Sequence, residues 1–227
     1  MPRDEELVVH SFDSGSSTQR AARDLLESGR ARIGHIVVAD QQTAGRGRLG
    51  RVWTSPPGGL YATFIVPSDR LLALRAGLAV ARVLEALGVA VQLKWPNDLV
   101  VGERKLGGIL IEADADVARV GIGINLTTSP LGDATCLLDL GVRADRDALV
   151  RAIHSELVAQ ETEAHVLDSY RARSATLGRR VRIDVGAGRT LDGRAVGIDA
   201  LGRLLVETQD GVEVVSSGDC LHAPIVD

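Results

Sequence analysis

Lysine and asparagine are rare in this sequence. Only Lys94 and Lys105 are lysine among the 26 basic residues, and Asn97 and Asn125 are the only asparagines. A general preference for arginine explains the surface, but a compact ammonium group binds ligands differently from a planar guanidinium. Because three of these four residues lie within one short segment, we expect that segment to belong to a functional site.

Signals for disulfides, membrane spans and nucleophilic catalysis are also missing. Cys136 and Cys220 are isolated, so no disulfide framework or CxxC metal site is expected. No apolar run approaches the roughly 18–20 residues that cross a bilayer, and the acidic N-terminus does not resemble a signal peptide. The histidines show no HxH or HExxH spacing, and no Ser-His-Asp pattern is visible. We therefore predict a cytoplasmic protein with no membrane partner and no enzyme nucleophile.

The pattern of apolar residues predicts an α+β fold with a mixed or antiparallel sheet. Closely spaced strands favour hairpins over repeated βαβ units. The expected strands are 7–12, 36–39, 60–66, 89–94, 99–101, 107–112 and 117–124. The expected helices are 16–29, 70–87 and 145–173, with Ser16 or Ser17 capping the first and Asp145 the last.

The chain changes in character after Leu177. Four alternating segments, 180–185, 189–198, 203–208 and 212–216, are separated by glycine-containing turns. About fifty residues of short strands predict a small β-barrel-like module. We therefore divide the chain into residues 1–176 and 177–227.

A glycine-rich loop at 45–51 fits the dinucleotide fingerprint GxGxxG, but its context does not. The fingerprint requires a helix after the third glycine, and here the sequence continues as Arg-Val-Trp-Thr-Ser-Pro-Pro. What remains is a loop with Arg46, Arg48 and Arg51, which suits an anionic ligand that must be covered after binding. The alternative is a solvated basic loop.

Three further clusters are each weak alone. Residues 94–98 (KWPND) combine a lysine, an amide and a carboxylate that could hold Mg²⁺, or they form an ordinary β-turn with Trp95 in the core. Gly107 and Gly108 weaken a strand, which is tolerable where a ligand approaches the backbone. The segment 121–125 (GIGIN) ends a strand in an amide.

Taken in order, STQ at 17–19, QTAGRGRLGR at 42–51, KWPND at 94–98, KLGGIL at 105–110 and GIGIN at 121–125 closely resemble the biotin–protein ligases. The match extends from about residue 8 to residue 222, and the joint pattern is specific although no single motif is. The resemblance implies a mixed-sheet catalytic domain with flanking helices, of the class II synthetase-like biotin/lipoate ligase type, followed by an SH3-like barrel.

The resemblance also implies a two-step reaction. Biotin and Mg-ATP would give biotinyl-5′-AMP, and a lysine of a biotin carboxyl carrier protein of a carboxylase would then accept the biotin. The enzyme would supply positioning and neutralise phosphate charge. ATP, Mg²⁺ and biotin are therefore the expected small-molecule partners, and a homodimer is an open expectation. Little room precedes the first motif for a DNA-binding domain, so no specific DNA binding is expected.

Site residues are carried over from the family motifs one by one. Lys105 and Arg48 are the expected catalytic residues, with Lys105 between the biotin carboxylate and the α-phosphate, and Asp98 is a metal-associated carboxylate. Biotin would contact Ser17, Thr18, Gln19, Gln42, Arg46, Gly47, Arg48, Lys105 and Gly108. The adenylate would contact Arg48, Trp53, Lys94, Asn97 and Asn125. Gln19 departs from the usual asparagine, and its amide would donate to the ureido group.

Three other functions compete with this prediction. A lipoate–protein ligase shares the fold and the adenylation chemistry. A catalytically idle biotin-binding or sensor module would need no Lys105, Arg48 or Asp98. A nucleic-acid-binding barrel at 178–227 is disfavoured by the balanced charge of that region.

Overall fold

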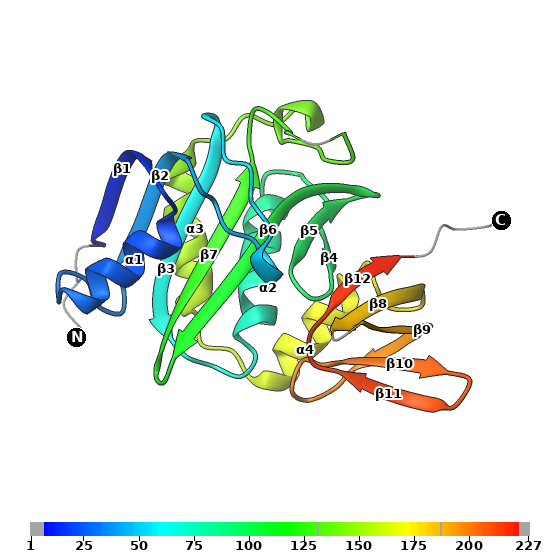
Figure 1. The fold of residues 1–227 in the computed structure, drawn as a ribbon. Helices are drawn as coiled ribbons and strands as arrows, with labels where there is room; N and C mark the ends of the chain where they lie inside the picture. The colour runs from blue at the N-terminus through cyan, green and yellow to red at the C-terminus, as the bar shows by residue number, and fades with distance from the viewer. Residues whose placement is uncertain (1–6, 131, 187, 223–227) are drawn as a thin grey trace.

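The computed structural model describes residues 7–130, 132–186 and 188–222, which form two β-sheets and four α-helices (Figure 1). A seven-stranded sheet has the order β1-β2-β3-β7-β6-β5-β4. Its strands are β1 (Val9–Gly15), β2 (Ile36–Gln42), β3 (Gly59–Pro67), β4 (Gln92–Lys94), β5 (Asp98–Val101), β6 (Arg104–Asp114) and β7 (Val117–Asn125).

This sheet is mixed, as predicted. β1 pairs with β2 in parallel, and each other neighbouring pair is antiparallel. The parallel pair is joined through α1 (Thr18–Glu27), because parallel neighbours need a crossover connection. The remaining strands are joined largely by short turns, which is the hairpin arrangement that the closely spaced apolar segments predict.

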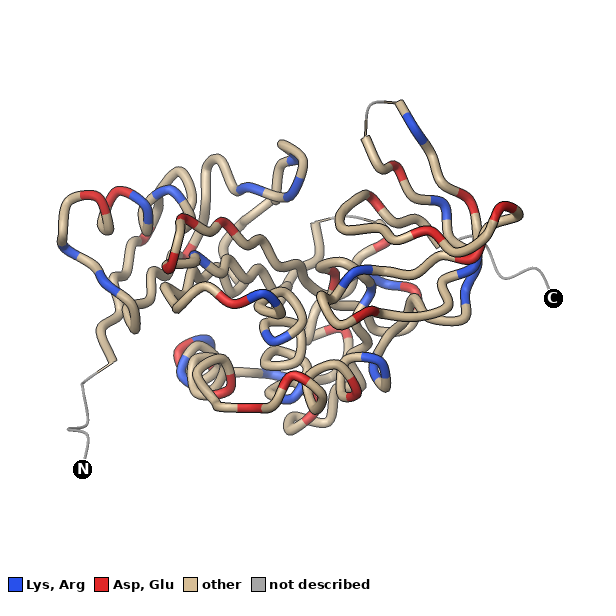
Figure 2. Tube along the Cα trace, turned by 90° about the horizontal axis from the view of Figure 1, so that it is seen from below, with Lys and Arg blue, Asp and Glu red and all other residues tan. Residues whose placement is uncertain are grey.

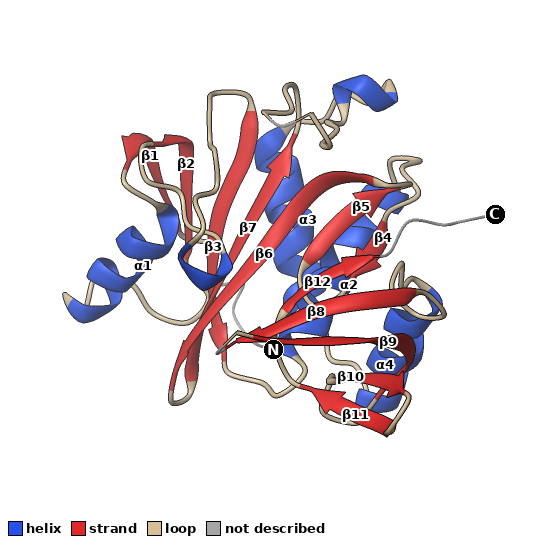
Figure 3. Cartoon of the chain, turned by 45° about the vertical axis from the view of Figure 1, so that its right-hand side comes forward, coloured by secondary structure: helices blue, strands red, loops and turns tan. Residues whose placement is uncertain are grey.

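The two faces of the sheet are covered by different helices (Figure 3). Side chains alternate along β2: Ile36 and Val38 join the main core, whereas Val37 packs with Ala22 and Leu25 of α1. The main core is formed by α2 (Leu72–Glu85), α3 (Arg146–Val158) and α4 (Glu163–Ala172). The other face carries the single helix α1.

Capping side chains mark the beginnings of α1, α3 and α4, whereas α2 begins without one. Ser17 caps α1 by accepting from the amide of Arg20, and Asp145 caps α3. The predicted helical stretch 145–173 is two helices, because the backbone becomes extended at Ala159. Thr162 then caps a new helix, α4. The apolar spacing alone predicted one helix. The extended residue Ala159 and the cap at Thr162 divide it into α3 and α4.

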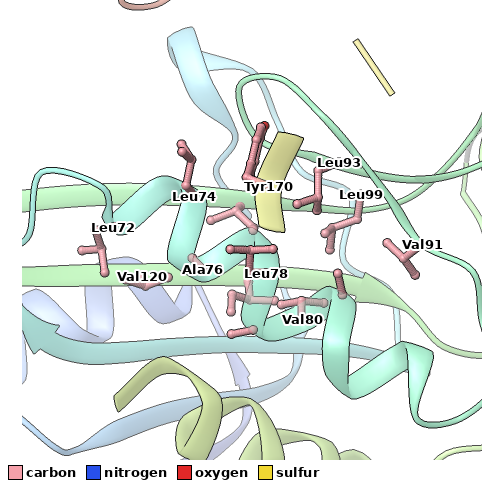
Figure 4. Close-up of a cluster of buried hydrophobic side chains, with 14 of the residues drawn as sticks. Leu72, Leu74, Ala76, Leu78, Val80, Val91, Leu93, Leu99, Val120 and Tyr170 are labelled. Atoms are coloured by element: carbon pink, nitrogen blue, oxygen red, sulfur yellow. The ribbon is translucent and has the colours of Figure 1, made fainter. Parts of the chain in front are cut away.

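The core is built around α2, nine of whose residues are buried (Figure 4). Leu78 and Leu84 are fully or almost fully buried, and each such side chain contributes about 1.5–3 kcal/mol through the hydrophobic effect. Gly77 of α2 faces Leu93, and a Cβ atom there would stand 3.4 Å from its side chain, in ordinary van der Waals contact. Trp95 is 2% exposed, so the prediction that it is a core residue agrees with its position.

The C-terminal sheet is antiparallel, with the order β11-β10-β9-β8-β12. Its strands are β8 (Arg180–Gly186), β9 (Arg189–Ile198), β10 (Leu204–Thr208), β11 (Gly211–Val215) and β12 (Asp219–His222), of which β12 was not predicted. Among the described residues the sheet is open between β11 and β12, so the expected barrel is not closed by hydrogen bonds. The division of the chain after residue 176 remains a proposal.

The two sheets share one hydrophobic core. Val181, Ile183 and Leu204 of the C-terminal sheet belong to the same buried cluster as the residues around α2. The indole N–H of Trp95 donates to the carbonyl of Gly202 at 3.2 Å. No helix within the described residues is long and apolar enough to cross a membrane.

Candidate active site

A cavity of about 250 Å³ lies on the face of the large sheet that α1 covers. It brings together segments that are far apart in the sequence: the start of α1, the loop 43–58, and strands β6 and β7. Twelve predicted site residues line it: Ser17, Thr18, Gln19, Gln42, Arg46, Gly47, Arg48, Trp53, Asn97, Lys105, Gly108 and Asn125. Two predicted residues, Lys94 and Asp98, lie outside this lining.

Glycines form the floor of the cavity. Gly108 of β6 and Gly123 of β7 are paired in register, and the ring of Trp53 lies against both. A Cβ atom on Gly123 would stand 2.6 Å from the indole nitrogen of Trp53, and one on Gly108 would stand 3.2 Å from the ring. We expected a ligand to approach the backbone at Gly107 and Gly108. At Gly108 the group that approaches is the ring of Trp53, a side chain of the protein itself.

Gln19 uses its amide nitrogen within the protein. The nitrogen donates to the carbonyls of Leu110 at 2.7 Å and Arg119 at 3.2 Å. A Cβ atom on Gly121 would stand 2.7 Å from this nitrogen, so glycine is required beneath it. Both amide hydrogens are engaged in this arrangement, whereas the side-chain oxygen is buried without a hydrogen-bond partner among the described residues. Contact between Gln19 and a ligand remains a prediction.

The other polar residues near the start of α1 form one connected network. The side-chain oxygen of Gln42 accepts from the backbone of Thr18 at 2.8 Å, and its nitrogen donates to Ser55 at 2.7 Å. The hydroxyl of Thr63 donates to that of Thr18 at 2.9 Å. Thr18 and Thr63 are buried and uncharged, so this end of the cavity is a fixed, neutral set of donors and acceptors.

The loop 45–51 is folded back on itself as a short hairpin. Gly47 donates its amide to the carbonyl of Arg51 at 2.8 Å, and Trp53 donates to Gly45 at 2.9 Å. Leu49 adopts a positive φ of 55° at the tip. A Cβ atom on Gly45 would stand 2.3 Å from the carbonyl oxygen of Trp53, so only glycine fits there. The loop is thus an ordered cover.

Arg48 points from this loop toward the turn that contains Asn97 and toward Gly218, just before β12. Its guanidinium donates to the side chain of Asn97 at 3.2 Å and to the carbonyl of Gly218 at 3.4 Å. Burial lowers the pKa of Arg48 from its ordinary value, and the positive charge of Arg51 lowers it further. The group stays protonated at neutral pH, because an arginine starts so far above it.

Lys105, like Arg48, brings a positive charge to the cavity lining. Its ammonium lies 2.6 Å from a carboxylate oxygen of Asp98 and 5.4 Å from the centre of the Trp53 ring. The geometry fits an ion pair combined with a cation–π contact. Asp98 therefore acts on the cavity through Lys105, although it does not line the cavity itself.

The two asparagines support the walls. Asn97 donates from its side chain to the carbonyl of Ile109 at 3.0 Å, and Asn125 donates to that of Thr135 at 3.0 Å. Each also lines the cavity, so each has a structural role in addition to any contact with a ligand. Sequence reasoning missed Pro130 and Ala134, which lie in a segment without a recognisable motif.

Lys94 lies by the C-terminal sheet, away from the cavity lining. Its charge contributes to lowering the pKa values of Glu103, Cys220 and His222. The larger influence on Cys220 is burial, which raises the pKa of its thiol to about 12. The pKa of His222 falls to about 4, first because of burial and then because of Lys94. Contact between Lys94 and a nucleotide remains a prediction.

Comparison with known proteins identifies similar chains. The sequence model of the Biotin/lipoate A/B protein ligase family matches residues 11–128, and that of the Biotin protein ligase C terminal domain matches residues 176–222. A biotin–[acetyl-CoA-carboxylase] ligase of Mycobacterium tuberculosis is 37% identical, over 93% of this chain and 88% of that protein. A bifunctional ligase/repressor of Bacillus subtilis is 33% identical over 95% of this chain and 73% of that protein.

Comparison with solved structures also finds biotin protein ligases. A biotin protein ligase from Aquifex aeolicus in complex with biotin and ATP has a TM-score of 0.81 and 30% identity, covering 95% of this chain and 98% of that one. A biotin protein ligase from Leishmania major in complex with biotinyl-5-AMP has a TM-score of 0.70 and 31% identity, covering 93% of this chain and 100% of that one.

Proposed function

Since the chain belongs to the Biotin/lipoate A/B protein ligase family, we propose that its cavity is the site of an ATP-dependent biotin–protein ligase. The enzyme activates biotin as biotinyl-5′-AMP and transfers it to a lysine of a biotin carboxyl carrier protein of a carboxylase. The observation that carries this proposal is the polarity of the cavity. A neutral hydrogen-bonding end, an apolar floor and a cationic end follow one another as do the ureido ring, the aliphatic chain and the carboxylate of biotin.

The neutral end suits the ureido ring. Thr18 and Gln42 are held by the network with Thr63 and Ser55, so their positions are set before the ligand arrives. A preorganised site avoids the entropic cost of ordering these side chains on binding. Trp53, which lies against Gly108 and Gly123, offers an aromatic surface between the two ends.

The cationic end suits adenylation. A carboxylate oxygen of biotin forms a bond to the α-phosphorus of ATP, and the bond from that phosphorus to the β-bridging oxygen breaks, releasing pyrophosphate. Negative charge gathers on the phosphoryl oxygens during this step. Lys105 and Arg48 supply fixed positive charge there, which is the form of stabilisation that contributes most in such reactions.

Transfer needs no nucleophile from the enzyme. The neutral ε-amine of the acceptor lysine attacks the carbonyl carbon of the mixed anhydride, the bond from that carbon to the phosphate oxygen breaks, and AMP leaves. The new amide loses its extra proton to solvent. The loop 45–51, which lies over the cavity, would retain the adenylate until the carrier arrives.

Asp98 is the carboxylate that would meet Mg²⁺ brought in by the nucleotide. Mg²⁺ in nucleotide sites is held by one or two carboxylates together with substrate phosphates and waters. No group of three or more acidic, histidine or cysteine side chains suited to a metal occurs within the described residues. One carboxylate already paired with Lys105 fits a metal delivered by ATP better than a resident ion.

Mass spectrometry after mixing the protein with biotin and Mg-ATP tests the proposal. We expect biotinyl-AMP and pyrophosphate, and biotinylation once a carrier domain is added. A parallel incubation with lipoate separates this function from lipoate ligation. Binding of biotin without pyrophosphate release would identify a sensor module and contradict the proposal.

The remaining partner expectations can be tested with the same preparation. A homodimer would appear as a change of mass in analytical ultracentrifugation on adding biotin and ATP. An electrophoretic shift with specific operator DNA would contradict the expectation of no DNA binding. Fractionation of the native cell would test the cytoplasmic location.

A further inference from the structure

The loop 45–51 is tied to the large sheet through a charged cluster next to the cavity. Arg46, which sequence motifs assign to ligand binding, places a guanidinium nitrogen 2.8 Å from a carboxylate oxygen of Glu112. Glu112 lies on β6, two residues beyond Leu110 in the cavity lining. Because side chains alternate along a strand, Gly108, Leu110 and Glu112 share one face. The contact therefore joins the loop directly to the floor of the site.

Glu112 lies between positive groups that belong to different elements. Its second oxygen is 3.6 Å from the guanidinium of Arg119, its register partner on β7, and 3.5 Å from Arg23 of α1. Arg119 is 3% exposed and also pairs with Asp114 at 2.6 Å. Figure 2 shows that basic and acidic positions are interspersed along the chain. The second oxygen therefore makes ion pairs but no hydrogen bond, and the 2.8 Å contact with Arg46 is the shortest ion pair of Glu112 among the described residues.

We propose that Glu112 is a positioning residue that holds the loop 45–51 over the cavity through Arg46. Three observations support a reversible latch. Glu112 is 18% exposed and lies on a strand paired with β7, whereas Arg46 is 46% exposed and lies on the loop, so we take the loop as the moving partner. When Arg46 leaves, Arg119 and Arg23 still neutralise Glu112, so opening leaves no isolated buried charge. The isolated bridge from Arg46 to Val52 transmits the contact to the whole hairpin.

A second contact on the opposite side of the loop offers a comparison. Arg51 pairs with Asp219 of β12 at 3.0 Å, with side chains 54% and 41% exposed. Ion pairs that are more exposed to solvent are weaker. We therefore expect the Glu112 contact to restrain the loop more strongly than the Asp219 contact.

Tryptic cleavage of the full chain without ligand tests the latch. Trypsin cuts after arginine, and Glu112→Gln leaves all three loop arginines intact, so only loop opening changes. We expect cleavage at the loop to be about three- to fivefold faster than in the wild type, because the open population rises by the strength of one partly exposed ion pair. The matched control is Asp114→Asn, which also loses a contact to Arg119 but does not touch the loop.

Two further measurements separate a latch from a general loss of structure. Arg46→Gln removes the same contact from the loop side, and cleavage after Arg48 and Arg51 should rise by a similar factor. In the Glu112→Gln protein, preformed biotinyl-AMP should be released faster while thermal unfolding matches that of Asp114→Asn. Added salt should accelerate loop cleavage in the wild type more than in Glu112→Gln.

The outcomes are distinct. Equal cleavage of wild type and Glu112→Gln, or an equal rise in Asp114→Asn, would overturn the latch. Only the adenylate measurement rests on the proposed function. If the protein formed no biotinyl-AMP, the ligand-free cleavage rates would still decide the role of Glu112. If Glu112→Gln failed to fold, Arg46→Gln would decide it instead.

Discussion

The two ends of the cavity are built in different ways. The neutral end is a buried network of Thr18, Gln42, Ser55 and Thr63, all from the large sheet and its immediate connections. The cationic end is partly exposed and depends on the loop residue Arg48 and on the C-terminal sheet at Gly218. The first end is complete within a single layer, whereas the second combines the loop 45–51, strand β6 and the C-terminal part of the chain. We propose that recognition of the ligand depends on the first kind of structure and retention of its activated form on the second.

The largest effect is expected at the cationic end. Lys105→Arg should keep the fold but reduce pyrophosphate release by roughly 100-fold, because a planar fork cannot replace the compact ammonium between Asp98 and the substrate. The measurement is biotin-dependent pyrophosphate release. Arg104→Gln, the exposed neighbour on β6, is the matched control. Near-wild-type turnover of Lys105→Arg would remove the distinction between a catalytic and a recognition end.

The second-largest effect is expected from a substitution in the glycine floor between the two ends. Gly123→Ala places a methyl group against Trp53 and should raise the KM for ATP about tenfold, if stacking on that ring is lost. Overpacking should also cost about 1–3 kcal/mol of unfolding free energy. Gly132→Ala, with nothing within 4 Å of the added atom, is the control. A Gly123→Ala protein with unchanged nucleotide affinity would show that Trp53 has only a packing role.

The neutral end should show a smaller effect confined to binding. Thr18→Val leaves the hydroxyl of Thr63 without its acceptor and should raise the KM for biotin about five- to tenfold, with little change in kcat. Thr43→Val, an exposed hydroxyl that bonds only to Gly15 within this region, is the control. A fall in kcat as large as the rise in KM would mean that the neutral end also stabilises the transition state and does not act in binding alone.

The smallest effect concerns the C-terminal sheet and pH. The pKa of His222 in the folded protein is about 4, below its ordinary value near 6.5. The folded state thus binds fewer protons than the unfolded state, and stability is lost as pH falls from about 6.5 toward about 4. Urea midpoints measured across this range should fall less in His222→Gln than in the wild type. Parallel pH profiles for the two proteins would show that other groups control this loss.

Local patterns predicted much of the structure. The cap at Ser17, the strand glycines and the unusual loop at 45–51 all depend on residues close together in sequence, and their positions around one cavity follow the motif order. The mixed sheet was also expected from the short spacing of its strands. These features are governed by turn chemistry and alternation, which a sequence displays directly.

Long-range pairing was not predictable in the same way. Asp219 lies in β12, which has no distinctive apolar alternation, and its contact with Arg51 depends on how the two sheets meet. Glu112 looks like any solvent-facing acidic residue until β6 is paired with β7. Gln19 was predicted to bind the ligand because it belongs to the same motif as Ser17 and Thr18. Its two hydrogen bonds to the backbone of β6 and β7 depend on the folded sheet and could not be predicted from that motif.

The turn at Gly202 links the two halves of the chain in a way that bears on how such proteins can evolve. Its carbonyl accepts from the indole N–H of Trp95, and a Cβ atom added to Gly202 would stand 3.0 Å from Leu74 and 3.6 Å from Leu71, at the start of α2. A C-terminal sheet transplanted from a distant relative would have to bring a turn of the same shape and a matching indole partner. We therefore expect changes at this turn and at the tryptophan to accompany each other across lineages, because a hybrid with a turn of another shape would leave the indole N–H without its acceptor.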